Sequence, residues 1–215
     1  MKPLAIFGGT FDPIHNAHLR VAWEASEWLD AEVRLLPARV PPHRDPPVAD
    51  ARQRAALVRA ALAGQDRLRL DTRELDRDGP SYTIDTLIGL RDEIGPERPL
   101  VLLVGADAFA GLPGWHRWRE LFDHAHIGVL TRPGHEGGTL PNELRTKIAS
   151  RRATDARSLH ESPSGRVLAI PVTPLEISAS RIRADFAAGR EPRWLVPDAL
   201  FADPALLAPY RNPPT

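Results

Sequence analysis

The chain has no cysteine, no excess of charge of either sign and no long apolar run. Without cysteine, a disulfide scaffold, a thiolate nucleophile and a cysteine-ligated zinc site are excluded. Lysine plus arginine and aspartate plus glutamate both number 28, so no global basic field exists and nucleic acid is not an expected partner. No apolar stretch approaches the roughly 20 residues that span a bilayer, and the run after Lys2 is too short for a secretory signal. A cytoplasmic enzyme with no membrane partner is the expectation.

Lysine is also scarce and occurs only at Lys2 and Lys147. The other basic residues are arginines, which bind phosphate oxygens in bidentate geometry, together with histidines. A site for anions in this chain must therefore use arginine, histidine and backbone amides. The 215 residues are enough for one α/β core. We expect a single domain over 1–215, with a helical C-terminal segment from about 190.

Short apolar runs alternate with amphipathic segments along the chain, and the two patterns predict strands and helices respectively. The predicted strands are Leu4–Phe7, Glu32–Leu36, Leu68–Leu70, Leu100–Val104, His126–Leu130 and Val167–Ile170. The predicted helices are Asn16–Leu29, Asp50–Ala63, Tyr82–Glu93, Trp115–Ala125, Leu140–Arg151 and Ser178–Ala188. The expected N-caps are Asp50 and Ser81, and the expected helix stops are Gly64, Gly95 and Gly189.

This alternation predicts a doubly wound (Rossmann-like) α/β fold. It comprises a mostly parallel sheet with helices on both faces and a short helical C-terminal tail. In such sheets, ligands bind beyond the carboxyl ends of the strands, where the strand order reverses.

The most informative segment is the turn after the first predicted strand. It reads Gly8-Gly9-Thr10-Phe11-Asp12-Pro13-Ile14-His15-Asn16-Ala17-His18. It leads into a predicted helix, whose N-terminus presents unpaired N–H groups and a partial positive charge suited to phosphate. A P-loop is excluded because the turn has no lysine, and a dinucleotide fingerprint because G-x-G-x-x-G is missing. We interpret Asp12 as a turn residue that holds the glycine loop, not as a base.

A second constellation lies near the C-terminus. It reads Ile177-Ser178-Ala179-Ser180-Arg181-Ile182-Arg183. Ser178 can cap a helix, while Ser180 and Arg183 share one helix face because they are three residues apart. Hydroxyls and a guanidinium at a helix start suit the oxygens of a phosphate. The alternative is an ordinary capped helix in which Arg183 pairs with a surface carboxylate.

Together the two segments resemble the nucleotidyltransferase superfamily with the H-x-G-H signature. His15-Asn16-Ala17-His18 matches that signature, with Ala17 at the usual glycine position, and Ile177–Arg183 matches the second signature. Further segments look like bacterial nicotinate mononucleotide adenylyltransferases, so that the resemblance covers nearly the whole chain. They are Pro41-Pro42-His43-Arg44, Pro80-Ser81-Tyr82-Thr83, Gly105-Ala106-Asp107-Ala108-Phe109, Leu112-Pro113-Gly114-Trp115 and Thr131-Arg132-Pro133-Gly134.

The resemblance implies transfer of AMP from ATP to nicotinate mononucleotide, giving nicotinate adenine dinucleotide and pyrophosphate in NAD biosynthesis. It implies Mg²⁺ bound with ATP, and we expect no metal held by the protein itself. The implied catalytic residues are His15, His18 and Arg183. The implied ATP-binding residues are Gly8, Gly9, Thr10, Gly105, Asp107, Ser178 and Ser180. The implied mononucleotide-binding residues are His43, Arg44, Tyr82, Thr83, Trp115 and Arg132.

Several alternatives stay open at this stage. The acceptor is nicotinamide mononucleotide or another phosphate in one alternative, and the protein is a noncatalytic nucleotide-binding sensor in another. Trp115 fits a core position as well as a stacking platform, Asp107 fits a structural role, and His43 with Arg44 fits a solvated loop. A homo-oligomer is compatible with the sequence.

Overall fold

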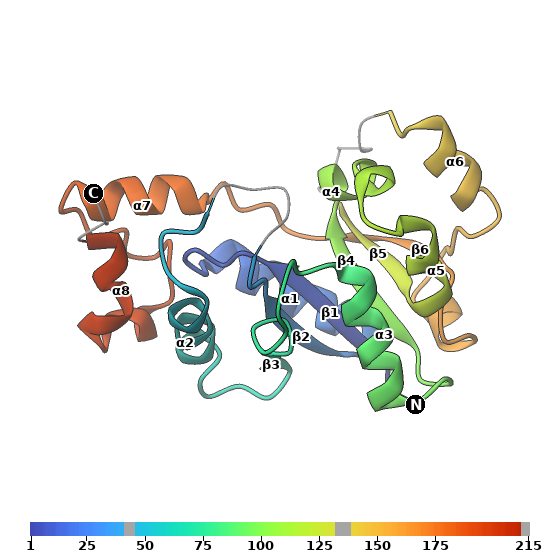
Figure 1. The fold of residues 1–215 in the computed structure, drawn as a ribbon, viewed down its shortest axis with the longest axis horizontal. Helices are drawn as coiled ribbons and strands as arrows, with labels where there is room; N and C mark the ends of the chain where they lie inside the picture. Colours follow the sequence, from blue (N-terminus) through green and yellow to red (C-terminus); the bar gives the residue numbers. More distant parts are fainter. Residues whose placement is uncertain (41–45, 132–138, 212–215) are drawn as a thin grey trace.

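Six parallel strands form the centre of the structure, a computed structural model that describes residues 1–40, 46–131 and 139–211. The strands lie in the order β3-β2-β1-β4-β5-β6, and each neighbouring pair is parallel (Figure 1). Their bounds are β1 Leu4–Gly9, β2 Glu32–Pro37, β3 Leu68–Leu70, β4 Leu100–Gly105, β5 His126–Thr131 and β6 Val167–Pro171. Every predicted strand is present, so the predicted doubly wound α/β fold is confirmed.

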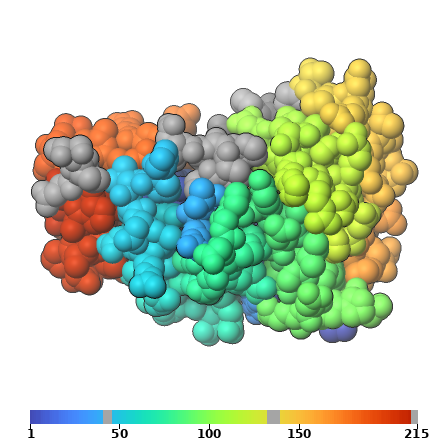
Figure 2. Space-filling view, in the orientation of Figure 1, coloured from blue at the N-terminus to red at the C-terminus, as the bar shows by residue number. Residues whose placement is uncertain are grey.

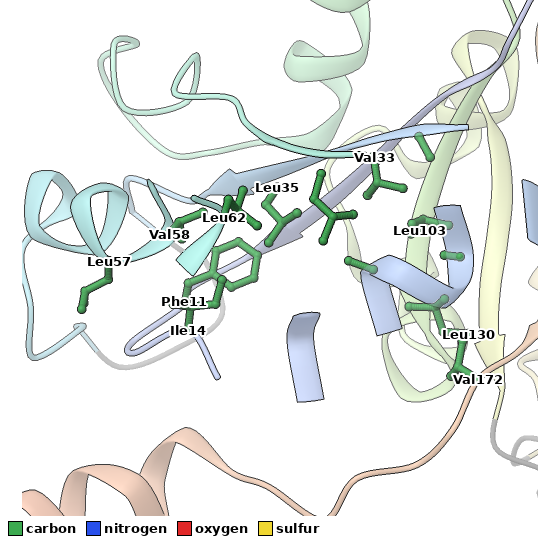
Figure 3. Close-up of a cluster of buried hydrophobic side chains, with 14 of the residues drawn as sticks. Phe11, Ile14, Val33, Leu35, Leu57, Val58, Leu62, Leu103, Leu130 and Val172 are labelled. Atoms are coloured by element: carbon green, nitrogen blue, oxygen red, sulfur yellow. The ribbon is translucent and has the colours of Figure 1, made fainter. Parts of the chain in front are cut away.

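The strands are apolar because helices cover both faces of the sheet. Alternate side chains of one strand enter two separate hydrophobic clusters: Val101 and Leu103 of β4 join the first, and Leu100 and Leu102 the second. Figure 3 shows part of the first cluster, where Phe11 from the turn after β1 lies among side chains from the sheet and from helix α2. The turn that carries the first motif is therefore part of the core.

Eight α-helices lie in the described ranges. They are α1 Asn16–Leu29, α2 Ala51–Ala61, α3 Thr83–Ile94, α4 Ala106–Ala110, α5 Leu121–His124, α6 Asn142–Ile148, α7 Ala179–Ala187 and α8 Pro204–Arg211. Helix α1 has the predicted bounds, and Asp50 is the predicted N-cap of α2 because its side chain accepts from the N–H of Gln53. Gly95 ends α3 at a φ of 80°, as predicted.

Two sequence predictions are corrected by the structure, and one helix was missed. The predicted helix 115–125 is broken, because Arg117 has a left-handed φ of 52° and is followed by the 3-10 helix Trp118–Glu120 and the short α5. Ser81 is not the N-cap of α3; Tyr82 is, because the Ser81 hydroxyl instead accepts a hydrogen bond from the N–H of Arg39 at 2.9 Å. Helix α4 was not predicted, since five residues show too little periodicity to be recognised.

The C-terminal tail is helical, as predicted, and it packs back onto the sheet domain. Helix α8 packs against α7 and α2, and these three helices lie together at the left of Figure 1. Figure 2 shows the red tail directly against the cyan segment that contains α2. The side-chain amide of Gln53 joins the two elements by donating to the carbonyls of Ala205 and Leu206 at 2.8 and 2.9 Å. The tail is thereby joined to α2, the helix that follows β2.

We predict opposite effects for alanine at two glycines. A Cβ at Gly128 in β5 would lie 2.9 Å from side-chain carbons of Ile170 and Leu103, so Gly128→Ala should lower the free energy of unfolding by about 1–3 kcal/mol. Gly89 lies inside α3, where an added Cβ would have no atom within 4 Å, so Gly89→Ala should raise it by about 0.5–1 kcal/mol. Urea denaturation of both variants measures the signs. Equal effects at the two positions would contradict the packing described for β5.

Candidate active site

The site lies where the strand order reverses, between β1 and β4. These strands pair through Phe7 and Leu103, so the turn after Gly9 and the end of β4 at Gly105 lie at the same edge. Helix α1 starts after the turn and α4 starts directly after Gly105. This is the position at which doubly wound sheets bind ligands.

The two motif histidines form a stacked pair at the start of α1. Their ring centroids are 3.6 Å apart with an angle of 19° between the planes, and the edge of Phe11 meets His18 at 5.1 Å. The main-chain N–H of His15 donates to Nδ1 of His18 at 3.3 Å. His15 is 5% exposed, whereas His18 is half-buried. Of the two rings, His18 is therefore the one accessible to a bound phosphate.

His15 is an uncharged imidazole at neutral pH. Burial lowers its pKa to about 4, and only a main-chain hydrogen bond opposes that shift. Its Nδ1 is buried without a well-formed hydrogen bond to any residue that the structure describes. His15 therefore fixes the orientation of His18 by stacking and by its main-chain N–H.

The second motif lies directly against the first. Nη1 of Arg183 in α7 donates to the main-chain carbonyl of Asp12 at 2.7 Å, and its Nη2 lies 3.5 Å from the Ser180 hydroxyl. Ser178 is the N-cap of α7, as predicted, since its hydroxyl accepts from the N–H of Arg181 at 3.2 Å. The structure thus brings together a glycine turn, two histidines and a serine–arginine helix start that are more than 150 residues apart in sequence.

Asp12 and Arg54 hold the turn from beneath. The carboxylate of Asp12 accepts from the N–H groups of Val48 and Ala49, which confirms that this residue holds the glycine loop. Arg54 is 1% exposed and donates to the carbonyl of Thr10 at 2.7 Å. The sequence alone did not single out Arg54, although its spacing places it on the same face of α2 as the buried Leu57 and Val58.

The glycines of the site differ in what fixes them. A Cβ at Gly9 would lie 2.9 Å from the ring of Phe11, so glycine is required there by packing. At Gly8 and Gly105 an added Cβ would have no atom within 4 Å, so their lack of a side chain leaves space above the strand ends. Asp107, in the first turn of α4, is exposed rather than a buried structural aspartate.

The residues expected to bind the mononucleotide lie around the start of α3. Tyr82 is its N-cap and Thr83 its first residue, and among the described contacts no side chain caps this helix start. The ring of Tyr82 stacks on His116, with centroids 4.4 Å apart. Trp115 is half-buried against the same hydrophobic cluster as Tyr82. His43, Arg44 and Arg132 lie outside the described residues.

Comparison with known proteins identifies the family from the sequence, and solved structures share the fold. The family described as "Cytidylyltransferase-like" matches residues 6–185. A "Probable nicotinate-nucleotide adenylyltransferase" of Pseudomonas aeruginosa is 50% identical over 201 residues, which cover 93% of this chain and 92% of the relative. The chain belongs to the nicotinate-nucleotide adenylyltransferase family. A relative of the same description from Halorhodospira halophila is 49% identical, with coverage of 93% and 91%.

Solved structures with much lower sequence identity to this chain share its fold. Plasmodium falciparum nicotinic acid mononucleotide adenylyltransferase, solved in complex with NaAD, matches with a TM-score of 0.64 and 17% identity over 89% of this chain and 87% of that chain. The same enzyme complexed with APC matches with a TM-score of 0.64 over 94% and 96%. In the described part of this chain, no helix is long and apolar enough to cross a membrane.

Because His15 is buried, we predict that the protein loses stability in mild acid. Between the usual pKa of 6.5 and the folded value of about 4, the unfolded chain binds a proton that the folded chain does not. The His15 contribution to the free energy of unfolding therefore falls by about 3 kcal/mol as the pH drops through this window. Urea denaturation from pH 7 to pH 4 should show a shallower decline for His15→Asn than for the unsubstituted protein. Parallel declines would show that His15 titrates normally in the fold.

Proposed function

We propose that the protein transfers the adenylyl group of ATP to nicotinate mononucleotide, forming nicotinate adenine dinucleotide and pyrophosphate in NAD biosynthesis. The observation that supports this most is the contact of Arg183 with the carbonyl of Asp12, because it joins the two phosphate-binding motifs in one site. The family membership of the chain supports the choice of acceptor, since relatives of about 50% identity are described as nicotinate-nucleotide adenylyltransferases.

The reaction requires positioning rather than a strong base. A phosphate oxygen of the mononucleotide attacks the α-phosphorus of ATP, and the bond from that phosphorus to the β-phosphate bridging oxygen breaks. The nucleophile is already an anion, so the protein has to bring two polyanions together and stabilise the charge that develops on the leaving pyrophosphate. His18, Ser180 and Arg183 supply donors for that charge. Transfer is direct and in line, without a covalent intermediate.

ATP is expected to enter with a divalent cation, and we propose Mg²⁺. Most groups around the site are imidazole, guanidinium and main-chain amide, which donate to phosphate oxygens rather than bind Mg²⁺. The carboxylate of Asp107 is exposed beside Gly105. Among the described residues, no group of three or more histidine, aspartate or glutamate side chains could hold a metal ion. The ion would enter with the phosphates of ATP and would neutralise part of their charge.

The glycine turn and the α7 start would bind the triphosphate. We assign Gly8, Gly9, Thr10, Ser178 and Ser180 to it. Gly105 and Asp107 would receive the adenosine, because open space lies above Gly105 and the Asp107 carboxylate is exposed beside it.

The other half of the site would bind the mononucleotide. The uncapped first turn at Tyr82 and Thr83 offers N–H groups to the nicotinate carboxylate, and Trp115 offers a ring for stacking. His43, Arg44 and Arg132 complete this assignment from the family resemblance alone. A carboxylate gains more than an amide from N–H donors at a helix start, which favours the acid over the amide.

The decisive experiment measures pyrophosphate release from ATP and Mg²⁺ with nicotinate mononucleotide and with nicotinamide mononucleotide in parallel. Faster turnover of the acid supports the proposed function. Faster turnover of the amide would show that nicotinamide mononucleotide, and not nicotinate mononucleotide, is the preferred acceptor. ATP binding without pyrophosphate release on either acceptor would indicate a nucleotide sensor instead.

We predict that His18→Ala lowers kcat by about 10²–10³-fold, the range for losing one donor to a transition state. Steady-state pyrophosphate release measures the effect. His160→Ala is the matched control, because His160 is exposed and lies in the 3-10 helix Arg157–His160, away from the glycine turn. A near-normal kcat for His18→Ala would remove His18 from the chemistry.

We predict that Trp115→Ala raises the KM for the mononucleotide more than it changes kcat. Stacking on the ring acts in the ground state and the transition state alike, so its loss weakens binding without slowing the chemical step. Trp28→Ala is the control, since Trp28 is 40% exposed near the far end of α1. An unchanged KM together with a lower melting temperature would assign Trp115 to the core.

A further inference from the structure

Tyr210 of the C-terminal helix α8 reaches the centre of the nucleotide half of the site. Its hydroxyl donates to Oδ1 of Asp12 at 2.8 Å, across 198 residues of sequence. Both side chains are inside the protein, with Asp12 5% exposed and Tyr210 1% exposed. Burial and the charge of Asp12 raise the pKa of Tyr210, so its hydroxyl stays protonated and remains a donor.

Packing alone does not explain a tyrosine at this position. The ring of Tyr210 stacks beside Phe186 at a centroid distance of 6.2 Å, and a phenylalanine would fill the same space. The hydroxyl loses its water on burial, and among the described residues it regains one hydrogen bond, which it donates to Asp12. Its specific effect is therefore on the orientation of that carboxylate.

The orientation of Asp12 affects the arginine that faces the phosphates. Oδ1 accepts from Tyr210 and from the N–H of Ala49, which leaves Oδ2 to accept from Val48 and to lie 3.7 Å from Nη1 of Arg183. The same Nη1 is bound to the Asp12 carbonyl at 2.7 Å. Side chain and main chain of one aspartate thus hold one guanidinium nitrogen, while Nη2 lies beside Ser180.

We propose that Tyr210 is a positioning residue for the adenylyl transfer and acts on Arg183 through the carboxylate of Asp12. It touches neither substrate; it holds Asp12 so that Arg183 points its free donors toward the triphosphate. Helix α8 then contributes to the geometry of the nucleotide site as well as packing on the core. This inference rests on the proposed function only for its rate measurements.

The test is a double-mutant cycle of Tyr210→Phe and Arg183→Gln. Tyr210→Phe alone should lower kcat about tenfold, as expected for losing one hydrogen bond to a charged group, and leave the KM for the mononucleotide within about twofold. In the Arg183→Gln background the same change should have little further effect, because the group through which it acts is gone. Ser26→Ala is the matched control, since it removes another buried hydroxyl, which in the described part of the chain donates to the carbonyl of Trp23.

The outcomes separate positioning from a purely structural role. An unchanged kcat for Tyr210→Phe overturns the proposal, and so does an equal loss in both backgrounds, since a structural effect would be independent of Arg183. If the unsubstituted protein turns over neither mononucleotide, the proposed function fails. Calorimetric ATP affinity of the same four proteins then replaces kcat. Tenfold weaker ATP binding that depends on Arg183 supports the positioning role, and additive or absent changes overturn it.

Discussion

The contact between the Arg183 guanidinium and the main-chain carbonyl of Asp12 is the interaction on which the site depends. It joins the first βα turn to the start of α7 at 2.7 Å and so makes one site from the two ends of the chain. The turn is packed against the core, because Phe11 is buried and its ring leaves no room for a side chain at position 9. This packing fixes the Asp12 carbonyl to which Arg183 donates. Buried packing beneath the turn therefore supports the phosphate recognition that we propose above it.

Charged groups surround this contact, although burial keeps His15 neutral. Arg54 lies beneath the turn and donates to the carbonyls of Thr10, Arg39 and Ala49. Asp12 is the carboxylate between Arg54 and Arg183, and its oxygens also accept hydrogen bonds from amides and a hydroxyl. Asp50 also acts on Arg54. Carboxylates thus balance the two arginines locally, and phosphate recognition in the proposed site rests on directed donors rather than on an excess of charge.

The sequence predicts the strands, α1 and the capped start of α7, because each depends on local periodicity or on residue types with one dominant physical role. That the two motifs share one site was implied by the family resemblance. It fails where tertiary contacts decide. Arg117 adopts a left-handed φ that no sequence pattern predicts. The Ser81 hydroxyl accepts a hydrogen bond from the N–H of Arg39 instead of capping α3. Arg54 and Tyr210 are missed for the same reason. A buried arginine and a buried tyrosine hydroxyl are recognisable only when the partners that satisfy them, Thr10 and Asp12, are seen in space.

The two halves of the proposed site are built with different interactions, in keeping with the ligand proposed for each. In the proposed nucleotide half, hydrogen bonds to buried charged groups hold the donors in place. The mononucleotide half uses Tyr82 stacked on His116 and a half-buried Trp115, together with a helix start that no described side chain caps. Aromatic contacts tolerate small displacements that hydrogen bonds do not. In the proposed reaction the nicotinate ring could therefore shift slightly within its stack, provided that the attacking phosphate oxygen of the mononucleotide stays in line with the α-phosphorus and the leaving oxygen.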